Sequence, residues 1–107
     1  MRDLAFPKPR RVRDPRLLRA YHVGHPRCEL LSCRRRAMPL PHHIRPNGLG
    51  GPGDVEENLL SLCRLHHVGN RGAHTLGHGA WFATFQDELE PLTRRKVAAA
   101  LGIEDAP

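Results

Sequence analysis

Three cysteines and a histidine stand at spacings that constrain this chain more than any other feature. They form two close pairs, Cys28-x4-Cys33 and Cys63-x2-His66. A structural zinc site uses four such ligands, usually as two close pairs that the fold brings together around one tetrahedral ion. We therefore expect these four residues to bind a structural Zn²⁺. Two alternatives stay open: the cysteines are small buried apolar side chains, or His67 takes the place of His66 as the fourth ligand.

The size and composition of the chain agree with a metal-stabilised domain. It has 107 residues, only 5% of them aromatic, with 10 Gly and 10 Pro, and so little apolar surface to bury. An odd number of cysteines argues against a disulfide framework and for a reducing compartment. No apolar run is long enough to cross a membrane, and the start of the chain lacks the apolar segment of a signal peptide. We expect a single cytoplasmic domain that does not enter a membrane.

A second set of residues is interleaved with the zinc ligands. It consists of the pair His42-His43, then Asn58, His67 and His74. The whole order, Cys-Cys-His-His-Asn-Cys-His-His-His, resembles the HNH endonuclease family, the ββα-metal nucleases with a structural zinc found in phages and bacteria. The resemblance covers residues 28–77. It implies a small α+β fold in which a zinc-stabilised ββα-metal hairpin and helix are flanked by N- and C-terminal helices.

The resemblance also implies a role for each residue of the second set. His42, His67 and His74 match ligands of a catalytic divalent metal, which is Mg²⁺, Mn²⁺, Ni²⁺ or Zn²⁺. His43 matches the general base, and Asn58 matches the residue that ties down the loop between the strands. Successive strand residues point to opposite sides, so one imidazole can face the metal while its neighbour reaches a water. A neutral imidazole can accept the proton of that water near neutral pH. For Asn58, a loop cap without a catalytic role is the alternative.

The formal net charge of +6 is unevenly distributed. Residues 1–36 contain 11 of the 17 basic residues and only three of the 11 acidic ones. Most of the basic residues are arginines, whose planar guanidinium groups suit phosphate, so a polyanionic partner is expected, with DNA the leading candidate. The candidate phosphate contacts are Arg34, Arg35, Arg36, Arg45 and Arg71. For Arg34–Arg36, a solvated turn is the alternative.

The remaining residues predict the elements around these motifs. Residues 1–13 form a flexible basic arm and residues 14–107 form the domain. The expected elements are a helix from Asp14-Pro15 to about His22, strands at Met38–Ile44 and Leu59–Leu62, and helices from about Arg64, over Ala80–Phe85, and from Glu90-Pro91 to Leu101. Trp81, Phe82 and Phe85 are expected in the core rather than stacked on bases. Asp54 is expected to cap a turn. His22, His25 and His78 lie outside the motif and receive no role.

The leading hypothesis is therefore a metal-dependent endonuclease that nicks or cuts DNA with little sequence specificity. The alternatives are a non-catalytic, zinc-stabilised nucleic-acid-binding module and a subunit of a phage complex that packages or recombines DNA. A binding module has no need of His43, so this histidine favours the enzyme.

Overall fold

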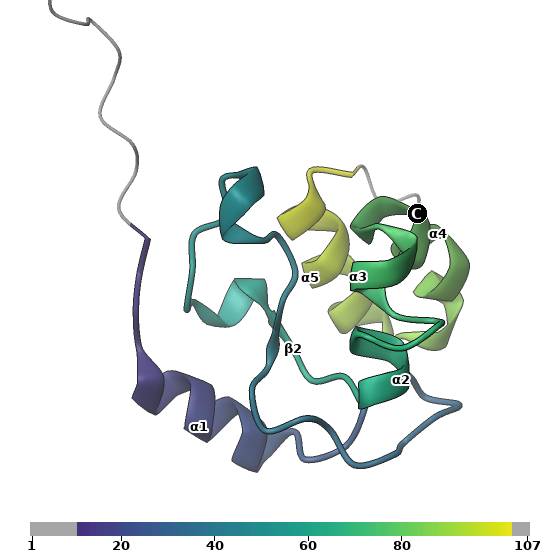
Figure 1. Ribbon diagram of the computed structural model, residues 1–107, viewed down its shortest axis with the longest axis horizontal. Helices are drawn as coiled ribbons and strands as arrows, with labels where there is room; N and C mark the ends of the chain where they lie inside the picture. The colour runs from purple at the N-terminus through teal and green to yellow at the C-terminus, as the bar shows by residue number, and fades with distance from the viewer. Residues whose placement is uncertain (1–10, 104–107) are drawn as a thin grey trace, which may run out of the picture.

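The chain folds as a small α+β domain in which short elements surround a two-stranded sheet (Figure 1). A computed structural model describes residues 11–103. Residues 1–10, which make up most of the predicted basic arm, and residues 104–107 lie outside the described part. Val12, near the end of that predicted arm, pairs with Gly53, and its carbonyl accepts a hydrogen bond from the Asp54 N–H at 2.8 Å. The folded unit therefore includes residue 12.

Two longer helices lie near the two ends of the chain, and both have the caps that the sequence predicts. Helix α1 spans Pro15–Gly24, and the Asp14 side chain accepts a hydrogen bond from the Leu17 N–H. Helix α5 spans Pro91–Leu101 and ends at Gly102, whose φ of 70° is readily adopted by glycine. Figure 1 shows α1 at one end of the domain, with α5 on the opposite side of the hairpin beside the other helices.

The hairpin consists of β1, His42–His43, and β2, Leu59–Leu60. The strands are antiparallel, with His42 opposite Leu60 and His43 opposite Leu59. Two short 3₁₀ turns, η1 (Asn47–Leu49) and η2 (Glu56–Asn58), lie in the loop between them. The predicted strand from Met38 to Ile44 is thus shorter than expected, because Pro39 and Pro41 have no N–H to donate to a neighbouring strand.

Three short helices follow the hairpin and cover one side of it. They are α2 (Arg64–His67), α3 (Ala73–Leu76) and α4 (His78–Phe85), and the 3₁₀ turn η3 (Gln86–Glu88) leads from α4 to α5. Helix α4 packs against both α3 and α5, and α5 contacts η2. The core lies between these helices and the hairpin, where Trp81, Phe82 and Phe85 are buried with Ile44 and Leu60. The three aromatic side chains are therefore core residues, as predicted.

A buried hydrogen-bond network attaches α1 to the rest of the domain. The Tyr21 hydroxyl donates to Glu29 Oε2 at 2.6 Å, and Lys96 Nζ on α5 donates to the Tyr21 oxygen at 2.7 Å. Glu29 Oε2 also accepts the backbone N–H of Ser61 at 2.8 Å. The segments that contain Glu29, Ser61 and Lys96 are thus joined to α1 through Tyr21. Within residues 11–103, no helix combines the length and the apolar character needed to cross a bilayer.

Candidate metal centres

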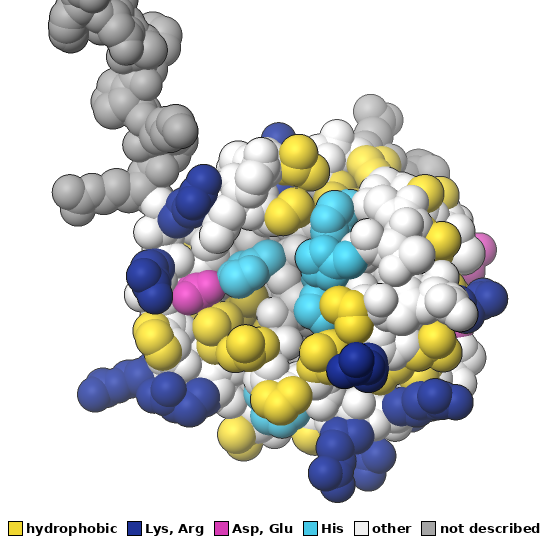
Figure 2. All heavy atoms as spheres, in the orientation of Figure 1, with side chains coloured by type: hydrophobic (Ala, Val, Ile, Leu, Met, Phe, Trp, Pro, Cys, Tyr) yellow, Lys and Arg dark blue, Asp and Glu magenta, His cyan; other side chains and the backbone are white. Residues whose placement is uncertain are grey.

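Two groups of metal-ligating side chains form in this fold. We call Cys28, Cys33, Cys63 and His66 the Cys3His cluster, and His42, His67 and His74 the histidine cluster. Within each cluster, one ligand atom per residue lies within 4.8 Å of all the others. The structure therefore brings together both sets of candidate ligands that the sequence predicts. Figure 2 shows histidine side chains gathered in the middle of one face, with an acidic side chain beside one of them and Lys and Arg side chains around the rim.

The Cys3His cluster is built from a tight turn and the start of α2. In the turn, the Cys28 N–H donates to Arg35 O at 2.7 Å and the Cys33 N–H donates to Leu30 O at 3.0 Å. Cys63 is the N-cap of α2, and His66 follows it within the same helical turn. Both α2 ligands therefore point to one side, toward the cysteines of the turn.

The distances in the Cys3His cluster fit four ligands of one tetrahedral ion. The Cys33 and Cys63 sulfurs are 3.7 Å apart, and His66 Nδ1 lies 3.3 Å from Cys63 Sγ and 3.9 Å from Cys28 Sγ. Metal–ligand bonds of about 2.3 Å to sulfur and about 2.0 Å to nitrogen give tetrahedral edges of about 3.8 Å and about 3.5 Å. Cys28 is fully buried, and burial raises the pKa of its thiol to about 12. At neutral pH a cation is needed to stabilise the thiolate there, and its binding would release a proton.

The histidine cluster joins β1 to helices α2 and α3. His67 Nε2 and His74 Nε2 lie 3.1 Å apart, close to the roughly 3.0–3.4 Å separation of two nitrogens bound to one ion at about 2.1 Å. The His42 ring centroid is 4.9 Å from that of His67 and 5.3 Å from that of His74. The three rings thus converge on one point at the surface of the hairpin.

Gly72 allows the chain to turn back, so that His74 lies beside His67, seven residues earlier in the sequence. A Cβ atom at position 72 would lie 2.4 Å from the His67 carbonyl oxygen, so only glycine allows the chain to pass this close to α2. The Thr75 hydroxyl then ties the start of α3 to Gly69 O at 2.8 Å. This close turn places the His74 side chain beside α2.

Two rings of the histidine cluster, His42 and His67, are neutral at physiological pH. Burial, followed by the neighbouring histidines, lowers the pKa of His42 to about 2. The same two causes lower the pKa of His67 to about 4. A neutral imidazole has the free lone pair that a metal ligand needs. His42 and His67 are therefore available as neutral metal ligands.

His43 lies beside the histidine cluster and has a partner that the sequence does not reveal. Its Nε2 is 2.7 Å from Asp54 Oδ1, while Asp54 Oδ2 accepts the Asp14 N–H at 2.8 Å. Partial burial alone would raise the pKa of Asp54, but the hydrogen bonds from Asp14 and His43 outweigh it and the pKa is lowered. Asp54 is thus a carboxylate held against the imidazole. It caps neither 3₁₀ turn of the loop, so the prediction of a turn cap is wrong.

A cleft of about 280 Å³ opens in front of His43, His67 and His74. Leu18 of α1 and Leu40 line it together with residues of the loop that follows β1. His43 is partly exposed, with 31% of its side-chain surface accessible. A solvent molecule or substrate can therefore reach both the His43 ring and the histidine cluster from the same side.

Asn58 holds together the loop between the two strands. Its side-chain oxygen accepts the Arg45 N–H at 2.8 Å, and its amide donates to Arg45 O at 3.2 Å and Gly53 O at 3.1 Å. It is 1% exposed. These bonds fix the backbone on both sides of the loop, next to His43 and next to Asp54.

Replacing Asn58 by alanine is expected to destabilise the domain by about 2–4 kcal/mol, because it leaves a buried carbonyl of Gly53 and part-buried backbone groups of Arg45 without these partners. Urea unfolding monitored by circular dichroism measures the change. The matched control is Asn70→Ala at an exposed asparagine, where we expect a shift below about 0.5 kcal/mol. Equal shifts in the two variants would contradict a bracing role for Asn58.

The predicted phosphate-contacting arginines do not gather at the cleft. Arg45 donates from Nε to Leu49 O and lines a groove against α5, on which Arg95 and Lys96 also lie. The Arg71 guanidinium lies 5.2 Å from the centroid of the Phe85 ring. Arg35, like Arg71, lowers the pKa of His66, though burial contributes more. Arg35 and Arg71 therefore lie on the side of the Cys3His cluster.

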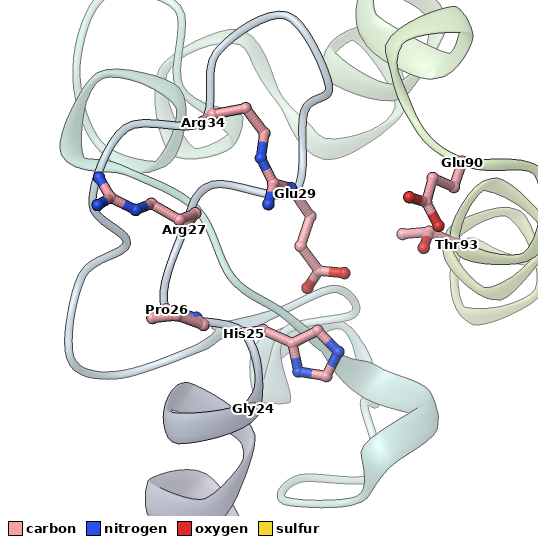
Figure 3. A pocket seen from close by; sticks show the side chains of 8 residues that line it. All are labelled: Gly24, His25, Pro26, Arg27, Glu29, Arg34, Glu90 and Thr93. Carbon is pink, nitrogen blue, oxygen red and sulfur yellow. The ribbon is translucent and has the colours of Figure 1, made fainter.

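Arg34 points into a separate polar cavity of about 170 Å³ between the end of α1 and the start of α5 (Figure 3). In Figure 3 its side chain extends toward Glu29, while Glu90 lies on the far wall. Arg34 has a φ of 57°, and Arg36 pairs with Arg27 across the base of the turn. Arg34, Arg35 and Arg36 are all exposed. The turn thus presents positive charge away from the histidine cluster.

His78 is a second residue that sequence reasoning missed. It starts α4, directly after Gly77, whose φ is 90°. Its ring stacks on that of His42 with centroids 5.4 Å apart and an interplanar angle of 19°. The only signal for it in the sequence is its distance of four residues from His74.

No family model, curated protein or solved structure matches the chain.

Proposed function

We propose that the chain is a metal-dependent endonuclease of the HNH class that hydrolyses phosphodiester bonds of DNA. The observation that supports this most directly is that His43, braced by Asp54, lines one cleft together with His67 and His74, while the buried His42 completes the histidine cluster behind them. The hairpin followed by α2 corresponds to the ββα arrangement that the proposal requires.

Zinc is the ion we assign to the Cys3His cluster. Three thiolates and one imidazole are soft and borderline ligands, and their tetrahedral spacing suits Zn²⁺ better than Mg²⁺ or Ca²⁺. The cluster is largely buried and leaves no position for a substrate. Its proposed role is to hold the 28–33 turn against α2, which in turn positions His67.

His43 is the residue we assign as general base. Because Nε2 faces the Asp54 carboxylate, the neutral ring carries its proton on Nε2 and keeps the Nδ1 lone pair free. Nδ1 then takes a proton from the attacking water, and Asp54 stabilises the imidazolium that results. A divalent cation held by His42, His67 and His74 would supply charge neutralisation at the phosphate and at the leaving oxygen. Asn58 keeps β1 and the Asp54 segment at a fixed separation.

DNA is the substrate we propose because the chain is strongly basic and rich in arginine. The predicted arginine contacts do not line the cleft, so we propose that they bind the sugar-phosphate backbone at a distance from the cut phosphate. Because the proposed contacts are to the sugar-phosphate backbone, we propose cleavage with little sequence preference.

Supercoiled plasmid tests the proposed function. We expect the zinc-loaded protein to convert it to nicked or linear DNA when Mg²⁺, Mn²⁺ or Ni²⁺ is added, with products ending in 5′-phosphate and 3′-hydroxyl. The matched control is the same protein with no added divalent ion. Binding of the plasmid without cleavage under all three ions would replace this proposal by a non-catalytic nucleic-acid-binding module.

A further inference from the structure

Three residues that line one small cavity each have a buried ring nitrogen without a hydrogen-bond partner. These nitrogens are His42 Nδ1, His78 Nδ1 and Trp81 Nε1. The three residues line a cavity of about 10 Å³ between β1, α4 and α5, whose other walls are apolar and include Ile44 and Val97. His42 and Trp81 are 3% and 2% exposed, so bulk water does not reach their buried nitrogens.

Three unpaired polar atoms in one place are unusual in a folded protein. Leaving a buried donor or acceptor unsatisfied costs about 1–3 kcal/mol, and nearly all such groups are paired with protein or with ordered water. A cavity holds one water when its volume, measured with a water-sized sphere, reaches about 10–15 Å³ and when two to four polar groups surround it. The cavity behind His42 meets both conditions.

We propose that one buried water occupies this cavity and bridges His42, His78 and Trp81. The indole N–H of Trp81 can only donate, so the water accepts from it. The proposed function needs a free lone pair on His42 Nε2, so we place the His42 proton on Nδ1; the water then accepts from His42 Nδ1–H and donates one hydrogen to His78 Nδ1. These three bonds match the usual number for an internal water. They assign opposite tautomers to the two stacked rings: the proton is on Nδ1 in His42 and on Nε2 in His78.

The consequence for His42 is that its Nε2 lone pair is left free for a cation in the cleft. This step rests on the proposed function, in which His42 is a metal ligand. Histidine ligands usually donate their second ring N–H to a fixed partner, and removing such a partner typically lowers metal affinity about 10–100-fold. His78 and Trp81, acting through the water, are thus positioning residues for His42.

Two measurements on the protein without DNA and without a second metal test the water directly. A crystal structure at about 1.5 Å should show one ordered water within hydrogen-bond distance of the three nitrogens. Long-range ¹H–¹⁵N NMR spectra should show His42 as the Nδ1–H tautomer and His78 as the Nε2–H tautomer. A dry cavity, or the opposite tautomer at His42, would overturn the proposal.

Substitutions at His78 separate the water from the packing of the ring. His78→Phe keeps a ring against His42 but removes Nδ1, and His78→Asn keeps a polar group near the position of Nδ1. We expect Ni²⁺ affinity, measured by calorimetry on protein with full zinc content, to fall about 10–100-fold in His78→Phe and less in His78→Asn. His25→Phe, at an exposed histidine, is the control and should bind Ni²⁺ as the wild type does. Unchanged affinity in His78→Phe would overturn the positioning role. A failed cleavage assay would contradict the proposed function alone, because the crystal structure and the NMR spectra test the water and the tautomers without any measurement of activity.

Discussion

Replacing His43 by alanine is expected to slow DNA cleavage about 10²–10⁴-fold while both metal clusters keep their ions, because the substitution removes the proposed proton acceptor and no ligand. His43 belongs to neither cluster, and its side chain is partly exposed. The fold should therefore tolerate the change. Single-turnover nicking of plasmid gives the rate, and zinc content with a thermal melt shows that the protein is intact.

Two further variants test whether the loss of cleavage is specific to the His43 side chain. His25→Ala removes an exposed histidine of α1's C-cap and should leave the cleavage rate unchanged. Asp54→Asn keeps a hydrogen-bond acceptor beside His43 Nε2 but removes the charge that stabilises the imidazolium, so it should cause a smaller loss than His43→Ala. Cleavage by His43→Ala at the wild-type rate would exclude His43 as the base.

Substituting the adjacent residues His66 and His67 is expected to have opposite effects on stability and on metal content. His66→Ala removes a ligand of the Cys3His cluster, so we expect zinc to be lost and the domain to unfold. Structural zinc contributes apparent binding free energies of about 10–16 kcal/mol in small zinc-binding peptides, which is comparable to the whole stability of a domain. His67→Ala should keep one zinc per chain and a folded circular dichroism spectrum, and lose binding of the second metal together with cleavage.

Zinc stoichiometry by plasma mass spectrometry and second-metal affinity by calorimetry distinguish the two variants. Val68→Ala, at the exposed position that follows them, serves as the control. The assignment of ligands fails if His67→Ala loses zinc while His66→Ala retains it. That outcome would mean that the two neighbouring histidines exchange roles relative to the structure.

The ends of the helices could be predicted from the sequence because their signals are local. Asp14 followed by Pro15 starts α1, and Glu90 followed by Pro91 starts α5, which Gly102 ends. The Cys3His set could also be predicted, since it consists of two short pairs, whereas the histidine set was expected from the resemblance to the HNH family. The length of β1 could not be predicted in this way. The Met38 N–H donates to Leu62 O and the Ile44 N–H donates to Asn58 O, but Pro39 and Pro41 interrupt the pairing between these two bonds.

The partners of the candidate site residues depend on contacts that sequence spacing does not encode. Asp54 reaches His43 because Gly53, with a φ of 87°, lies so close to Val12 that a Cβ there would be 2.3 Å from the Val12 carbonyl oxygen. His78 reaches His42 because the left-handed Gly77 redirects the chain at the start of α4. Neither contact has a periodic or motif signature, so both appear only in the folded chain.

The position of His66 and His67 on one four-residue helix affects how metal-depletion experiments can be interpreted. If the proposed zinc is removed from the Cys3His cluster, we expect the segment that carries His67 to be released, so that the histidine cluster would lose a ligand at the same time. Activity lost on treatment with a strong chelator therefore does not identify which of the two ions was extracted. Weak chelators, paired with a direct assay of residual zinc, are needed to assign inactivation to the exchangeable ion.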